Sequence, residues 1–85
     1  MEYTDELLDE LQKRLARVEG QVRGIATMLR ERRECRDVVT QIAAASKALD
    51  QVGFRLVAAG LSSCLQDPDA EKRVAEFERM FSQLA

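Results

Sequence analysis

Two cysteines, Cys35 and Cys64, are the residues of this 85-residue sequence best suited to chemistry, and the sequence contains no histidine. They stand 29 positions apart. In one continuous helix that spacing is about eight turns, which puts both thiols on one stripe but roughly 43 Å apart along the axis. A disulfide needs Cα atoms within about 7 Å, so the two thiols of one chain cannot meet. Two copies of the helix packed antiparallel about Leu49 and Asp50 would instead place Cys35 beside Cys64 of the partner subunit. Paired thiols without an imidazole favour sulfur chemistry over a usual metal site.

The charge along the chain is uneven, although its formal net value is only −2. Residues 1–12 carry five acidic and no basic side chains, whereas residues 13–36 carry eight basic and three acidic ones. Such a basic segment predicts a positive surface that an oligomer would repeat, as nucleic-acid binding requires. The alternative is a solvated helix face whose charges are satisfied by ion pairs.

Composition also narrows the function classes. The missing histidine removes the commonest general base, so an enzyme is not expected. The acidic start lacks the apolar run of a signal peptide, and two cysteines without a framework spacing fit a reducing compartment. We therefore expect a cytoplasmic protein.

Apolar periodicity predicts an all-α fold, and its strongest signal is a first helix over residues 5–32. Thr4 is the expected N-cap of this helix. The apolar positions follow each other at spacings of three and four residues, which is typical of a coiled-coil seam. These positions are Leu8, Leu11, Leu15, Val18, Val22, Ile25 and Leu29.

Two more helices are expected, at 35–65 and 68–84, so that residues 1–85 form one domain. The second has a thin apolar stripe flanked by small residues, and such a helix needs partners on more than one side. The third is predicted to begin with Asp67 as its N-cap and Pro68 as its first helical residue. A unit this small buries little surface alone, so it is expected to assemble.

Two segments of the chain, RLARVEGQVRGI at 14–25 and CRDVVTQIAA at 35–44, resemble the copper-sensitive operon repressor family. The resemblance implies a small bacterial transcriptional repressor made of three-helix subunits. It implies antiparallel dimers with a four-helix-bundle core that pair again into a dimer-of-dimers tetramer. Such repressors bind double-stranded operator DNA without a helix-turn-helix, and a metal or a reactive small molecule releases them.

The cysteines suggest which inducer is sensed. Copper-sensing members of the family place a cysteine at the start of the second helix, and a histidine and a second cysteine four residues apart across the dimer. Here Cys35 and Cys64 match the cysteines, but Gly60 stands at the histidine position. This pattern is similar to the persulfide-sensing sulfurtransferase-operon repressors, so we expect reactive sulfur species to be the partner and no cofactor to be required.

Two alternatives remain open at this point. In the first alternative, the same repressor responds to Cu(I), held by the Cys35 and Cys64 thiolates, because soft ligands suit this ion. A helical assembly module without a DNA role is the second alternative. The resemblance implies basic contacts to DNA on the first two helices, and Gln51 occupies a position that is basic in some relatives. Our candidates for these contacts are Lys13, Arg14, Arg17, Arg23, Lys47 and Arg55.

Overall fold

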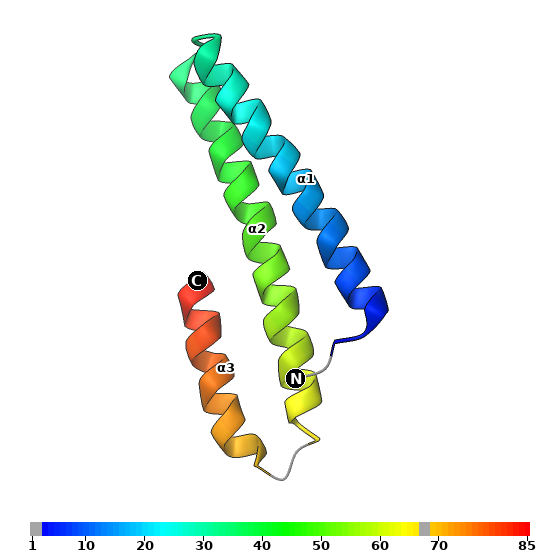
Figure 1. Cartoon of the computed structure of the whole chain (residues 1–85). Helices are drawn as coiled ribbons and strands as arrows, with labels where there is room; N and C mark the ends of the chain where they lie inside the picture. The colour runs from blue at the N-terminus through cyan, green and yellow to red at the C-terminus, as the bar shows by residue number, and fades with distance from the viewer. Residues whose placement is uncertain (1–2, 67–68) are drawn as a thin grey trace.

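The computed structural model describes residues 3–66 and 69–85 and contains three helices in these parts of the chain. They are α1 (Asp5–Arg30), α2 (Cys35–Cys64) and α3 (Ala70–Leu84). Helices α1 and α2 form a long antiparallel hairpin, and α3 turns back along the C-terminal half of α2 on the side away from α1 (Figure 1). The predicted all-α, three-helix fold is confirmed.

The molecule is a single layer of helices. Its extents are 55 × 26 × 12 Å, and 12 Å is about the diameter of one helix with its side chains. Helices α1 and α3 each pack against α2 and make no contact with one another within residues 3–66 and 69–85. A single layer has two open faces, so it cannot enclose a core by itself.

Local sequence sets the start of α1. The backbone N–H of Leu7 donates to the Thr4 hydroxyl oxygen at 3.1 Å, which satisfies one of the free donors at the helix N-terminus. Asp5 and Glu6 lie in the first turn, where the helix dipole favours acidic side chains. The predicted cap at Thr4 is therefore confirmed.

The end of α1 falls two residues before the predicted one, and Arg32 is the reason. Arg32 adopts a φ of 56°, in the left-handed region. The N–H of Arg33 donates to the Met28 carbonyl at 3.0 Å, and that of Arg32 to the Leu29 carbonyl at 3.2 Å. This pair of bonds is a Schellman motif, which usually has glycine at the left-handed position. No glycine or asparagine marks this turn in the sequence, so periodicity alone extended the helix too far.

Replacing Arg32 by glycine is expected to stabilise the fold, because glycine adopts a positive φ without the steric cost borne by other residues. The gain should be about 0.5–1 kcal/mol, since the added freedom of the unfolded chain offsets part of it. Urea unfolding measures it. Arg33→Gly is the matched control, because Arg33 has no positive φ and glycine there should not stabilise. Equal effects of the two substitutions would contradict this account of the turn.

The helices meet through a small set of apolar side chains. Buried apolar side chains recur at an interval of seven residues, at Leu11 and Val18 of α1 and at Val38, Ala45 and Val52 of α2. On the other side of α2, the Phe54 and Phe81 rings lie 5.1 Å apart, and a Cβ added to Gly53 would lie 2.8 Å from the Leu84 methyl groups. Gly53 therefore leaves room for the Leu84 side chain against α2.

The other helix ends lie close to their predicted places. Helix α2 ends at Cys64, one residue before the expected end, and α3 begins at Ala70 instead of residue 68. The predicted start signal at Asp67 and Pro68 lies outside the described residues. In the described part of the chain, none of the helices has the length and apolar character that a membrane crossing needs.

Candidate functional site

The two cysteines mark the two ends of α2. Cys35 is its first residue, has an exposed side chain, and follows the four-residue turn that Arg32 closes. Cys64 is its last residue. At about 1.5 Å per residue the two positions lie roughly 43 Å apart, so one chain cannot join them. Any chemistry that uses both thiols therefore needs two chains.

A column of exposed apolar side chains runs along both long helices. The α1 stripe predicted from periodicity divides in two: Leu11 and Val18 are buried against α2, whereas the residues at the alternate positions are 39–61% exposed. On α2, Val39, Ile42 and Leu49 are 46–55% exposed. We call this set the apolar seam, and its members are Leu8, Leu15, Val22, Leu29, Val39, Ile42 and Leu49.

The apolar seam and the first cysteine share one stripe of α2. Cys35, Val39, Ile42 and Leu49 follow one another at helical spacings of four, three and seven residues. A second copy that covers the α2 part of the seam would therefore also cover the position of Cys35. Among the described residues, no group of three or more Cys, Asp or Glu side chains gathers as a metal site within one chain.

The basic candidates fall into two groups. Arg14 and Arg17 line a hollow of about 140 Å³ with Gln51, and Arg14, Gln51 and Arg55 line a neighbouring one of about 460 Å³. Lys47 lies four residues before Gln51 and eight before Arg55, hence on the same face of α2. Arg14, Arg17 and Arg55 line the α1–α2 groove, and Lys47 lies beside Gln51 on α2 without lining either hollow. We call these four residues together the basic face.

The other two basic candidates, Arg23 and Lys13, do not belong to the basic face. Arg23 stands nine residues after Arg14, about half a turn away around α1, so the fold does not bring these two together. It pairs with Glu19 at 3.4 Å, and Lys13 pairs with Asp9 at 3.0 Å, with side chains more than 60% exposed in both pairs. Such exposed pairs within one helix hold their charges only weakly.

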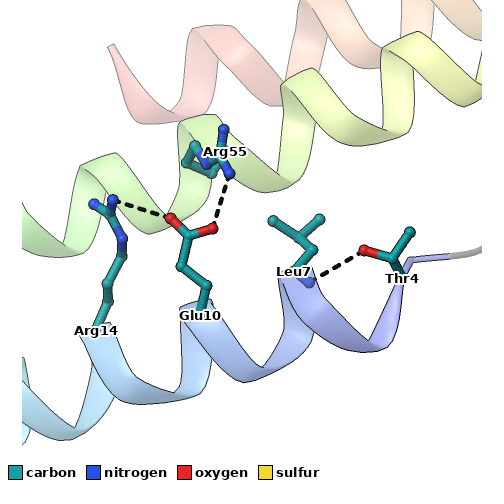
Figure 2. Close-up of polar contacts among 5 residues, drawn as sticks. All are labelled: Thr4, Leu7, Glu10, Arg14 and Arg55. Carbon is teal, nitrogen blue, oxygen red and sulfur yellow. Dashed lines mark hydrogen bonds and ion pairs between the residues drawn. The ribbon is translucent and has the colours of Figure 1, made fainter.

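Glu10, which sequence reasoning missed, lies between two members of the basic face (Figure 2). Its Oε1 accepts a hydrogen bond from Arg14 Nη2 at 3.1 Å, and its Oε2 accepts one from Arg55 Nη2 at 3.0 Å. The hydrogen bond and the charge of Arg55, together with Arg14, lower the pKa of Glu10, although partial desolvation opposes this shift. The spacing of Glu10 and Arg14 signals their pairing, but nothing in the sequence indicates Arg55, 45 positions away.

Known proteins resemble this chain over nearly its whole length. A family model described as the metal-sensitive transcriptional repressor matches residues 8–83. The copper-sensing transcriptional repressor RicR of Mycobacterium tuberculosis is 43% identical over 82 residues, covering 89% of this chain and 85% of the relative. The copper-sensing transcriptional repressor CsoR of Bacillus subtilis is 35% identical over 77 residues, covering 86% of this chain and 76% of the relative.

Solved structures agree with these relatives. The copper-sensing repressor CsoR with Cu(I) from Geobacillus thermodenitrificans superposes with a TM-score of 0.83 at 32% identity, covering 98% of this chain and 91% of that one. The nickel-responsive transcriptional regulator InrS gives a TM-score of 0.82 at 30% identity, with full coverage of both chains. Fold and sequence thus define the class of protein as a small helical transcriptional regulator. The chain belongs to the metal-sensitive transcriptional repressor family.

These findings confirm the family resemblance and the prediction of a repressor instead of an enzyme. They contradict the prediction that no cofactor is required and that Cu(I) is disfavoured. The relatives are copper-sensing, and the solved neighbours are named for their response to copper or nickel. The physical reason is that two thiols are themselves soft ligands suited to Cu(I), so the absence of histidine does not exclude this ion. Nothing in the comparisons supports the persulfide-sensing branch.

Proposed function

We propose that this repressor assembles through the apolar seam, binds double-stranded operator DNA in the cytoplasm through the basic face, and releases it when Cu(I) binds. The observation that carries the proposal is the placement of Cys35 and Cys64 at opposite ends of α2, with Cys35 on the stripe of the exposed seam. An antiparallel pair of α2 helices centred near Leu49 then joins the thiols of two subunits, twice in each dimer.

The donor set fits Cu(I). Cys35 of one subunit and Cys64 of the partner subunit would hold the ion, because soft thiolates suit Cu(I) and the sequence offers no imidazole. Nickel favours nitrogen and oxygen ligands in tetragonal geometry, which this thiol pair does not provide. When bound, Cu(I) supplies a link between the start of α2 in one subunit and its end in the other. The two cysteines would thereby fix the relative position of the helices that carry the basic faces. This biases the assembly away from its DNA-binding form.

The basic face suits the DNA backbone. Arg14, Arg17, Lys47 and Arg55 come from two helices that run side by side, and a dimer presents the face twice. Contacts of this type make DNA affinity fall with salt, by about one unit of log–log slope for each phosphate neutralised. The tetramer and the choice of operator belong to this proposal as expectations from the family resemblance.

A persulfide is the second candidate inducer, favoured by the absence of histidine and by Gly60 four residues before Cys64. The Cys35 thiolate would attack the outer sulfur of a persulfide RSSH and expel RS⁻, which leaves a cysteine persulfide. The Cys64 thiolate of the partner subunit would then attack the inner sulfur and expel HS⁻, which leaves a disulfide between the subunits. The persulfide is reduced and the two cysteines are oxidised.

One release experiment tests the proposal. An operator duplex selected from a randomised library is bound by the reduced protein without oxygen, and Cu(I), Ni(II) or glutathione persulfide is then titrated while fluorescence anisotropy follows the DNA. We expect release at about one Cu(I) per subunit and no release by Ni(II). Release by persulfide alone, with a disulfide seen by mass spectrometry, would replace Cu(I) by the second candidate. Failure of the reduced protein to bind any duplex would contradict both.

A further inference from the structure

Glu10 places a negative charge inside the basic face. Its two carboxylate oxygens hold Arg14 and Arg55 at 3.1 and 3.0 Å, and its side chain is 39% exposed. Asp9 and Glu19 also pair with basic candidates, but each of these pairs stays within α1. Glu10 instead joins α1 to α2 at the groove that the basic face lines (Figure 2).

The Glu10 carboxylate makes the same kind of bond that a DNA phosphate would make. Guanidinium groups bind carboxylates and phosphates through the same N–H donors, so an internal carboxylate occupies donors that a phosphate needs. It also cancels one of the two positive charges and repels an approaching phosphate. The two arginines remain solvent-accessible, with side chains 39% and 52% exposed, so a phosphate can reach them from outside.

We propose that Glu10 is an internal competitor of the DNA phosphate for Arg14 and Arg55, and that it thereby limits the affinity of the basic face for DNA. This inference rests on the proposed function, because it assumes that the basic face contacts DNA. It assigns to Glu10 a role in DNA binding that is opposite to the role of the arginines, because Glu10 lowers the affinity for DNA. A repressor that an inducer must detach needs an affinity that the inducer can overcome.

Glu10→Gln removes the charge and keeps the size of the side chain. We expect it to tighten DNA binding by about threefold per subunit, hence roughly tenfold for a dimer, the scale of one unit charge near water. The log–log salt slope should steepen by about one unit per subunit, because each basic face gains one uncompensated charge. The gain should be equal on the selected operator and on a random duplex of the same length, since phosphates carry no sequence information.

Two further variants separate competition from other effects. Glu76→Gln makes the same change in net charge on α3, away from the groove, and should alter affinity by less than about twofold through the remote field alone. Glu10→Asp keeps the charge but shortens the side chain, so its salt slope should stay that of the wild type. Circular dichroism and urea unfolding of all three variants check that the fold is retained.

Each outcome decides the inference. Tighter binding and a steeper slope for Glu10→Gln, but not for Glu76→Gln, support competition. Unchanged or weaker binding by Glu10→Gln, while the wild type binds its operator, would overturn the inference and leave the proposed function standing. Weaker binding with a wild-type slope would assign Glu10 to positioning the arginines instead. If neither protein binds either duplex, the proposed function fails together with the inference.

Discussion

Replacement of Cys35 by serine is expected to abolish the release of DNA by Cu(I) and to leave DNA binding by the reduced protein unchanged. The Cys35 side chain is exposed, so its loss removes no core packing. A hydroxyl is a poor ligand for a soft ion, and one of only two proposed thiolates is lost. Cu(I) affinity should fall by more than the roughly 10–100-fold that loss of an outer-shell partner of a metal site costs. Competition with a chelator of known affinity measures it.

A mixture of two variants tests whether the site is shared. Cys35→Ser and Cys64→Ser proteins should each fail to bind Cu(I) tightly, because every site in each dimer lacks one thiol. In a mixed dimer, the Cys64→Ser subunit contributes Cys35 and the Cys35→Ser subunit contributes Cys64, so one of two sites is complete. Refolding the two variants together should therefore restore Cu(I) binding to a fraction of the dimers. No recovery in demonstrated mixed dimers would contradict a site made across an antiparallel pair.

Leu49→Glu is expected to prevent assembly and with it DNA binding. Leu49 is 50% exposed in the single chain and lies at the proposed centre of the α2 pair, where the partner's Asp50 would face it. A charge enclosed there without a partner costs roughly 3 kcal/mol or more. The dissociation constant of the dimer should therefore rise by at least about a hundredfold.

Sedimentation velocity over a range of concentrations measures the assembly. Ala75→Glu introduces the same charge at an exposed position of α3, outside the apolar seam, and should leave the oligomer intact. The monomeric Leu49→Glu protein should also unfold at a lower urea concentration than the wild type, because a one-layer chain has few buried side chains of its own. If the Leu49→Glu protein keeps the oligomeric state of the wild type, the contact between subunits does not include Leu49. If the wild-type protein is itself a monomer, the proposal that the apolar seam is an interface between subunits is wrong.

Helix boundaries show how far local rules reach. Thr4 was found from sequence because an N-cap is a local bond between one side chain and a donor three residues on. The predicted end of α1 was two residues too late, because the left-handed position that ends the helix is occupied by Arg32 and not by the glycine that usually marks it. Turns of this kind depend on backbone bonds that most residue types can make at a modest cost.

The basic candidates show a different limit. Charge counting identified the segment, but it could not separate Arg14 from Arg23, which lie on opposite sides of α1. Arg55 joins Arg14 only because α2 runs back along α1 and places Glu10 between them. The prediction that no cofactor is required was wrong for a chemical reason, because two thiols are soft ligands that suit Cu(I) even where no histidine is present.

By itself, the sequence determined what depends on neighbours along the chain. The Thr4 cap is a bond between near neighbours, and the apolar repeat together with the 29-residue spacing of the cysteines placed Cys35 and Cys64 near opposite ends of one helix. Tertiary structure decided which half of each apolar stripe is buried and which half forms the apolar seam. It also decided that Glu10 spans two helices, because contacts between residues distant in sequence depend on how the helices pack and not on their individual patterns.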